Sequence, residues 1–358
     1  MALLSTAHDI ADARIHRISS ALDRAGVAHA VIATGSATSA PATATEVRVL
    51  ARQGKGRRVW RALTLPWRLP EALMVIDPEL LPSAFLATRV RRVPLVVDVH
   101  EDYAKVARDR PWARGPIGPM AALFAHVATL IAARAELTSV ADEHLPPQRA
   151  RHRIVVRNLP RRGEIPRSER NEHPRAIYIG DVRPSRGLFT MIDAISLAPA
   201  WELDIVGNVS EIPHGDIHKI LQERGLSERV RLHGRLVPSE AWAVARGAWC
   251  GFALLHDTPA YREAMPTKVY EYLGAGIPVI ATALPRVAAL LEAAQAGRTG
   301  DSAEQVAAIL RDWQVSPATV DGLASNARYW SDSTTGSVSP FDELAEAMVT
   351  VLPPPQGT

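Results

Sequence analysis

The stretch CGFALLHDTPAYREAMPTKVYEYLGAGIPVIATA, residues 250–283, decides the fold of this chain. Gly251 to Leu255 and Ile277 to Ala281 are short apolar runs, and Pro266 between them opens a helical pattern that ends at two closely spaced glycines. The pattern predicts a strand, a loop, a helix and a second strand. If both strands lie parallel in one sheet, loop 256–265 leaves the carboxyl end of the first strand, where open α/β sheets bind ligands.

The first turn of the predicted helix carries Thr267 and Lys268. Free N–H groups, a hydroxyl and an ammonium group at one helix start suit an anion such as phosphate. Lysine is rare here, four of the 41 basic residues, so a compact point charge at this place favours a phosphate site. Glu271 lies roughly 7 Å along the axis from Pro266, an offset that suits a sugar hydroxyl next to that phosphate. The alternative interpretation is a solvated Lys268–Glu271 pair at i,i+3.

Glu263 and Glu271, with seven residues between them, resemble the E-x7-E motif of the family 4 retaining glycosyltransferases of the GT-B fold. The surrounding PTKVYEYLGAGIPVIAT is similar to that family as well. The resemblance covers nearly the whole chain and is most specific at residues 76–103, 177–188 and 263–282.

Other matches lie in the first half of the chain. A D-x-R-x-x-R helix is matched by Asp12, Arg14 and Arg17, and a structural ion pair is an equal alternative for Asp12 and Arg14. A D-P-E-L-L-P turn and a D-x-H-E strand end that contains His100 follow. Two features depart from the family. No glycine-rich loop follows the first strand, where the sequence is STAHDIA, and Asp181 stands where many members have Arg.

The resemblance implies an α/β protein of the GT-B fold, with two facing Rossmann-like domains and a cleft between them. Residues 1–158 would form the N-terminal, acceptor-side domain, 159–174 a linker, and 175–335 the domain that binds the nucleotide sugar. Residues 336–352 would hold an amphipathic helix that returns to the N-terminal domain, before a disordered tail at 353–358.

The resemblance also implies the site. The catalytic residues would be Glu263, His100, Arg186 and Lys268, where Arg186 occupies the Lys position of the family's G-R-x-x-x-K-G loop. Glu263 and His100 would contact the donor sugar. The other residues expected to bind the nucleotide sugar are Glu271, Thr267, Pro266, Met265, Gly180, Arg183, Gly207 and Gly234, with structural turn glycines as the alternative for the last two.

The expected reaction is sugar transfer, with retained anomeric configuration, from a nucleoside diphosphate sugar to a lipid-linked or cell-surface glycan precursor. Fixed cations would stabilise the departing diphosphate, so neither a metal nor a cofactor is expected. Two alternatives remain open. One is a sugar nucleotide 2-epimerase, which shares the two-domain architecture, and the other is a degenerate glycosyltransferase that acts as a binding partner.

Charge is divided unevenly along the chain. Residues 1–160 hold 22 basic and 14 acidic residues, a balance of +8, whereas the remainder holds 19 and 24, a balance of −5. The sharpest excess lies at residues 48–68, which have seven basic residues, no acidic one, and Trp60 and Trp67. Such a stretch suits an anionic membrane surface, with a solvated face as the alternative. No nucleic-acid motif accompanies it, so nucleic acid is disfavoured.

The remaining patterns concern location and packing. No signal sequence and no apolar run of spanning length is present, so we expect a cytoplasmic protein that is peripheral on the inner face of the cell membrane. Residues 119–133 are expected to form a buried core helix. The single cysteine, Cys250, excludes a disulfide within the chain and is expected to be a buried, inert thiol.

Overall fold

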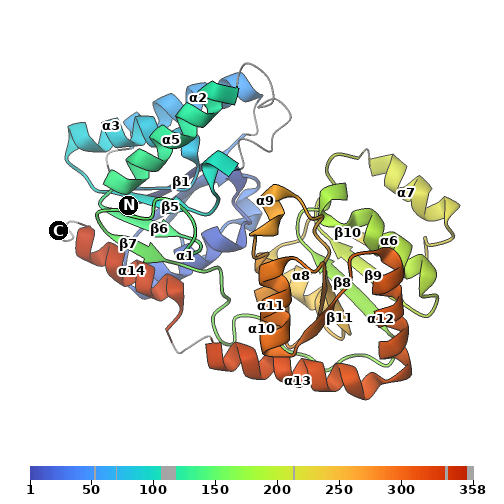
Figure 1. The fold of residues 1–358 in the computed structure, drawn as a ribbon. Helices are drawn as coiled ribbons and strands as arrows, with labels where there is room; N and C mark the ends of the chain where they lie inside the picture. Colours follow the sequence, from blue (N-terminus) through green and yellow to red (C-terminus); the bar gives the residue numbers. More distant parts are fainter. Residues whose placement is uncertain (52–53, 70, 106–117, 213, 335–337, 353–358) are drawn as a thin grey trace. The chain divides into compact units, whose positions relative to one another are not determined.

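The computed structural model describes residues 1–51, 54–69, 71–105, 118–212, 214–334 and 338–352. The chain divides into two compact units, and the division at Asn158 and Leu159 coincides with the predicted end of the first domain. Unit 1 comprises Met1–Asn158 and Val338–Thr358, and unit 2 comprises Leu159–Ser337. Each unit is a parallel sheet covered by helices, so the predicted pair of Rossmann-like α/β domains is confirmed (Figure 1).

The described sheet of unit 1 has seven strands in the order β3-β2-β1-β4-β5-β6-β7, all parallel. The strand order reverses between β1 and β4, so the loops that leave their carboxyl ends diverge there and expose a ligand-binding edge. The strands are β1 Ala2–Asp9, β2 Ala30–Thr34, β3 Glu46–Leu50, β4 Leu73–Val75, β5 Leu95–Val99, β6 Leu137–Val140 and β7 Arg153–Val155.

Helices cover both faces of this sheet (Figure 1). One face packs on α1 (Ala13–Arg24) and α14 (Pro340–Val351), and the other on α2 (Lys55–Thr64), α3 (Leu81–Arg91) and α5 (Gly118–Arg134). The burial of Ile15, Ile18 and Leu22 gives α1 the inward face that its sequence predicts. The C-terminal helix α14 lies against α1 through Phe341, whose ring is 5.3 Å from the Arg14 guanidinium.

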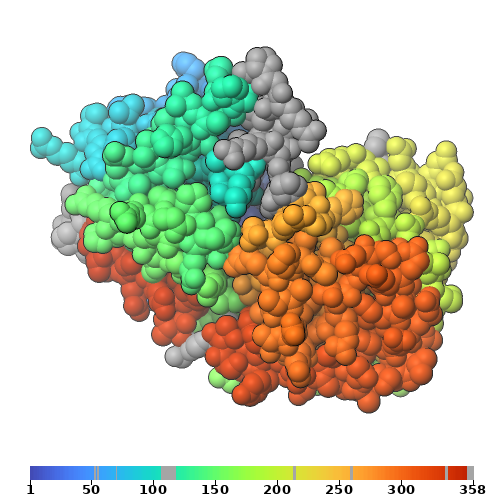
Figure 2. Space-filling model, in the orientation of Figure 1, coloured from blue at the N-terminus to red at the C-terminus, as the bar shows by residue number. Residues whose placement is uncertain are grey.

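The prediction of a buried core helix at residues 119–133 is wrong about which side chains are buried. Helix α5 turns its alanines inward, with Ala125, Ala128 and Ala132 buried. The segment lies at the surface of unit 1 in Figure 2. Its exposed large apolar side chains are Met120, Leu123, Phe124, Val127 and Leu130. Apolar residues all around a helix do not indicate which face packs, and the small alanines permit the closest approach to the sheet.

The sheet of unit 2 has the order β10-β9-β8-β11-β12-β13, again entirely parallel. Its strands are β8 Arg175–Ile179, β9 Glu202–Val206, β10 Val230–Gly234, β11 Cys250–Ala253, β12 Val279–Ala281 and β13 Gly297–Thr299. The helices are α6 Leu188–Leu197, α7 His214–Glu223, α8 Pro238–Ala245, α9 Pro259–Arg262, α10 Thr267–Ala275, α11 Pro285–Ala294, α12 Ala303–Val315 and α13 Pro317–Thr334. Cys250 is buried and free, as expected.

Residues 159–174, expected as a linker, are irregular but pack as part of unit 2. Ile165 is buried in its core, and the Arg170 guanidinium lies 4.4 Å from the centre of the Trp249 ring. Arg167 donates to Asp332 of α13 and to the carbonyl of Gly274. A run rich in proline and arginine lacks periodicity, so its sequence does not reveal that it is anchored at several points.

Asp12, Arg14 and Arg17 have structural contacts in unit 1. Asp12 caps α1, because its carboxylate accepts the N–H of Arg14 at 2.8 Å. The Arg14 guanidinium makes two hydrogen bonds, of 2.6 and 2.7 Å, to the carboxylate of Asp98 in β5, and both side chains are buried. Arg17 donates to the Asn158 side chain at 2.8 Å. This helix is therefore tied to the sheet by a buried ion pair.

We predict that Asp98→Ala destabilises unit 1 by about 3 to 5 kcal/mol, because it leaves the buried Arg14 guanidinium without an opposite charge. The matched control is Arg24→Ala, which breaks a more exposed pair with Asp342 and should cost about 1 kcal/mol or less. Urea unfolding followed by hydrogen exchange in peptides from β5 and β6 reports on unit 1 alone. Equal losses in the two variants would contradict this account.

Candidate functional site

The strand order of unit 2 reverses between β8 and β11, which are parallel neighbours with β9 on the far side of β8. Loops that leave the carboxyl ends of two such strands diverge and create a crevice. The loop after β8 contains Gly180, Arg183 and Arg186, and the loop after β11 leads to α9 and α10. The predicted residues of unit 2 therefore meet at one sheet edge.

Close backbone packing shapes this edge. Gly207 follows β9 with a φ of 149°, and a Cβ there would lie 1.7 Å from the carbonyl oxygen of Gly180. The N–H of Gly207 donates to the carbonyl of Gly234, at the end of β10, at 2.7 Å. Any side chain at Gly207 would push the loop after β8 away from the sheet, so this glycine has a structural reason besides any role in binding.

Lys268 lies in the first turn of α10 and is buried. Its ammonium nitrogen is 3.3 Å from the centre of the Tyr178 ring, and among the described residues it has no hydrogen-bond partner. Burial, together with the positive charge of Arg186, lowers the pKa of Lys268 well below its usual value. A buried ammonium without an acceptor is costly, and a bound anion would supply both the acceptor and the opposite charge.

Two arginines follow β8. Arg183 pairs with Asp181 and reaches Glu211 at 3.5 Å, so it neutralises the aspartate that departs from the family pattern. Arg186, at the end of a short 3₁₀ turn (η5, Pro184–Arg186), makes no ion pair within the described part of the chain, and its buried Nε has no partner there. Among the described residues, Arg186 and Lys268 therefore have donors available to an anion and no ion pair, whereas Arg183 has a free Nε but is paired through its other nitrogens.

Helix α10 is fixed to the sheet by Tyr272. The Tyr272 hydroxyl accepts the N–H of Ile179, the last residue of β8, at 2.9 Å. Its ring lies over Gly251 of β11, where a Cβ would come within 2.4 Å of it. The helix start, and with it Lys268, is thereby held beside the carboxyl end of β8.

The two glutamates of the E-x7-E pair have different surroundings. Glu271 is buried within α10, one turn beyond Lys268. Glu263 is exposed and follows the single turn of α9. Pro266 is the N-cap of α10, and Met265 before it packs against the apolar core. The alternative interpretation of Lys268 and Glu271 as a solvated pair is therefore wrong, because both side chains are buried.

His100 lies in unit 1, directly after β5. Its Nδ1 is buried without a partner among the described residues, and its ring meets the His8 ring edge-on at 4.6 Å. His8 in turn is hydrogen-bonded to Asp77 at 2.6 Å. Burial and the positive charge of His8 lower the pKa of His100. Each unit thus carries predicted site residues at the carboxyl edge of its own sheet.

Sequence reasoning missed four residues that shape these edges: Tyr178, Tyr272, His8 and Asp77. The tyrosines read as ordinary core residues. His8 lies within β1, which extends to Asp9 rather than ending near Ser5. The strand order would have indicated the contact between His8 and Asp77, because β1 and β4 are neighbours and the two residues lie at the same edge of the sheet.

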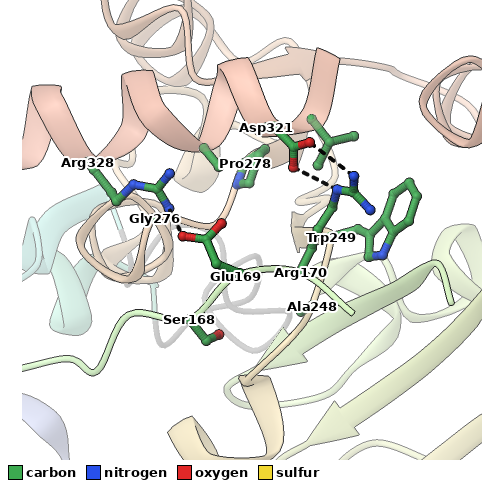
Figure 3. A pocket seen from close by; sticks show the side chains of 11 residues that line it. Ser168, Glu169, Arg170, Ala248, Trp249, Gly276, Pro278, Asp321 and Arg328 are labelled. Carbon is green, nitrogen blue, oxygen red and sulfur yellow. Dashed lines mark hydrogen bonds and ion pairs between the residues drawn. The ribbon is translucent and has the colours of Figure 1, made fainter. Parts of the chain in front are cut away.

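A small hollow in unit 2 lies elsewhere (Figure 3). Among the side chains that line it are Arg170, Asp321 and Trp249, with the arginine and aspartate paired at 2.7 Å. Trp249 directly precedes β11, so the hollow is at the amino ends of the strands and not at the carboxyl edge that holds Lys268. A second pair, Arg328 with Glu169 at 3.7 Å, also lines it.

No group of three or more His, Cys, Asp or Glu side chains within the described ranges is arranged to hold a metal ion. No helix in the same ranges has the length and apolar character needed to cross a membrane.

Residues 162–330 match the family model of glycosyl transferases group 1. The protein is a glycosyltransferase of the GT-B fold. A search of curated proteins finds no match. Among solved structures, Anabaena Alr3699/HepE in complex with UDP-glucose is 17% identical, with a TM-score of 0.72 over 98% of this chain and 99% of that one.

Two further structures are similar over comparable lengths. WaaG, a glycosyltransferase involved in lipopolysaccharide biosynthesis, is 18% identical with a TM-score of 0.67, covering 98% of this chain and 99% of WaaG. Sucrose-phosphate synthase from Thermosynechococcus elongatus is 15% identical with a TM-score of 0.70, covering 98% and 97%. At these identities the structural likeness concerns the fold.

We predict that Lys268→Met stabilises ligand-free unit 2 near neutral pH, because it removes a buried charge that has no acceptor. The folded-state pKa of Lys268 is below the unfolded value of 10.5, so the unfolded chain binds more protons between the two values. Wild-type stability should therefore rise with pH in that interval and approach that of the variant.

The measurement is urea unfolding at pH 7 and pH 9.5 in buffer without phosphate or nucleotide. Lys219→Met is the matched control, because that lysine is 73% exposed and should show neither effect. A Lys268→Met protein that is less stable than wild type at both pH values would contradict the electrostatic cost assigned to Lys268.

Proposed function

We propose that this glycosyltransferase belongs to family 4 and moves a sugar, with retention of configuration, from a nucleoside diphosphate sugar to a lipid-linked or cell-surface glycan precursor. One observation carries the proposal: Lys268 and Arg186 place buried nitrogens without partners at the carboxyl edge of unit 2. A diphosphate is the anion that would satisfy both cations together with the free N–H groups at the start of α10. The complex of Alr3699/HepE with UDP-glucose supports a donor of this class.

The chemistry follows from where charge develops. As the bond between the anomeric carbon and phosphate breaks, negative charge grows on the leaving diphosphate, and preorganised donors stabilise it most where water is excluded. Arg186, Lys268 and the amino end of α10 would fill this role, so the proposal needs neither a metal nor a cofactor. Attack from the same face, with the departing phosphate accepting the acceptor's proton, would retain the configuration.

The other predicted residues would position the donor. Buried Glu271 would accept hydrogen bonds from the ribose hydroxyls, and exposed Glu263 would contact the sugar. His100 would contact the sugar and the reacting phosphate. The surrounding contacts would come from Thr267, Pro266, Met265, Gly180, Gly207 and Gly234. Arg183 is proposed only as a minor contact, because it is paired with Asp181.

We predict that Arg186→Ala and Lys268→Ala each lower donor turnover strongly, by about 2 to 4 kcal/mol of transition-state stabilisation, with little effect on folding. The nucleotide is identified first by thermal shift with UDP, GDP and ADP, since a ligand at 100 times its Kd adds about 2.7 kcal/mol of stability. Release of nucleoside diphosphate from the matching sugar donor is then measured with and without acceptor sugars.

Lys219→Ala is the control for the loss of a lysine in the same unit and should keep full turnover. Activity within threefold of wild type in both site variants would overturn the assignment. Release that does not depend on the acceptor, together with an epimerised sugar, would indicate the epimerase instead, and failure to bind any nucleotide would indicate the degenerate enzyme.

We further propose that unit 1 docks on the anionic inner face of the cell membrane through residues 48–68. Helix α2 exposes Val59, Trp60 and Leu63 next to its arginines, and Trp60 is 68% exposed. Two other helices on the same face of the sheet add large exposed side chains, namely those of α5 and, on α3, Leu86 and Val90. Basic and aromatic side chains together suit the headgroup region of an anionic bilayer.

We predict that the protein floats with anionic vesicles but not with neutral ones, and that added salt weakens the binding. Arg57, Arg58 and Arg61 changed together to Gln should lose most of it, at about 1 kcal/mol per basic residue near the surface. The matched control changes Arg246, Arg298 and Arg311 of unit 2 to Gln. Equal flotation of both triple variants, or none for the wild type, would show that the stretch is a solvated face.

A further inference from the structure

The irregular stretch of β1 between Leu4 and Asp9 is organised around the Asp77 carboxylate. One carboxylate oxygen accepts the Ser5 hydroxyl at 2.7 Å and the backbone N–H groups of Thr6 and Ala7 at 2.6 and 2.9 Å. The other oxygen lies 2.6 Å from Nδ1 of His8. Asp77 is buried, and these four hydrogen bonds fix its carboxylate. The fixed carboxylate holds the His8 ring in one orientation, with a proton on Nδ1.

The same contacts keep His8 charged. Burial opposes protonation, but the hydrogen bond to Asp77 and the negative charges of Asp77, Asp12 and Glu101 outweigh it and raise the pKa of His8 to about 9. At neutral pH the ring is therefore an imidazolium. The hydrogen bonds of the His8 ring within the described residues all involve Nδ1, and none involves its other nitrogen, Nε2.

The neighbouring ring of His100 is in the opposite situation. It meets His8 edge-on, with 4.6 Å between ring centres and 84° between ring planes. Protonation of His100 would put a second positive charge beside His8, and it would place a proton on Nδ1, which is buried with no acceptor in the described part of the chain. Asp98 and Glu101 favour protonation, while Arg14 opposes it, and the net direction is a lowered pKa.

We propose that His8 is a positioning residue that acts through His100: held by Asp77, it keeps His100 as the neutral ring whose proton is on Nε2. His100 then offers a single N–H donor to an oxygen of the donor sugar or its phosphate, and it does so without changing charge or tautomer near neutral pH. The inference rests on the proposed function for the role of His100, but not for its protonation state.

The test is a pH titration of the full chain labelled with ¹⁵N in its histidines, with the His100 signals assigned from His100→Gln. In the wild type, His100 should show the pattern of the Nε2–H tautomer and protonate only below its ordinary pKa of 6.5. In His8→Gln its midpoint should shift upward, because the neighbouring charge is gone. His8→Lys keeps a cation beside Asp77 and should restore the low midpoint.

Both variants should fold, since Asp77 retains its bonds to Ser5, Thr6 and Ala7. The acidic limb of the pH profile for donor turnover should move upward in His8→Gln and return in His8→Lys, which a purely structural role would not produce. The signal of His152, which lies at the amino end of β7, serves as the internal control.

An unchanged His100 midpoint in His8→Gln, or a proton on Nδ1 in the wild type, would overturn the inference even if sugar donors are turned over. The converse result is equally clear. If the midpoint shifts as expected and no nucleoside diphosphate sugar is bound or turned over, the protonation control stands and the proposed function fails.

Discussion

The parallel pairing of β8 with β11 is the constraint on which the site of unit 2 depends. Because these strands are neighbours in the sheet but distant in the chain, their carboxyl ends bring the loop after β8 to the start of α10. Tyr272 then fixes α10 to the end of β8 by accepting the N–H of Ile179. The place of Lys268 follows from this one contact and from the glycine at 251 that leaves room for the ring.

Such a site is costly to the free protein. A buried ammonium over an aromatic ring gains some cation–π stabilisation, but it lacks the acceptors that water would offer. Arg186 adds a like charge nearby, which further disfavours the protonated lysine. Proteins tolerate local destabilisation of this kind where a ligand compensates for it, so the electrostatic strain at Lys268 supports an anion site better than the bare motif does.

Much of the architecture could be predicted from sequence, because strands such as 95–99 and 279–281 lie in largely apolar runs with clear ends. Helix α5 shows where this reasoning stops: an apolar helix has no polar face to indicate its orientation. The two helical patterns in residues 283–313 are helices α11 and α12 in the structure, which adds the short strand β13 between them and the long helix α13 after them. Short edge strands and helices of mixed composition have weak periodicity, so tertiary packing decides them.

In the candidate site, too, some features follow from local sequence and others only from tertiary packing. The position of Lys268 and the burial of Glu271 follow from helix periodicity and a helix start, both of which are local. The pairing of Arg183 with Asp181 is also local. The sequence does not show that the pair forms, because the same two side chains could have pointed apart. His8 and Asp77 are 69 residues apart and meet only because β1 and β4 are adjacent strands.

The carboxyl ends of the first strands of the two units, β1 and β8, differ in a way that favours unit 2 as the place of the proposed anion site. In unit 1 the N–H groups of Thr6 and Ala7 converge on an anion, but that anion is the carboxylate of Asp77, a part of the chain itself. In unit 2 the turn after β8 contains Arg186 and lies beside Lys268. The Nε of Arg186 and the Nζ of Lys268 are buried and have no such internal partner among the described residues. A glycine-rich loop at this place would leave its N–H groups free for a phosphate, whereas in STAHDIA the N–H groups of Thr6 and Ala7 already donate to Asp77. An external anion would therefore have to displace that carboxylate. The same carboxylate holds the His8 ring, which lies edge-on to His100.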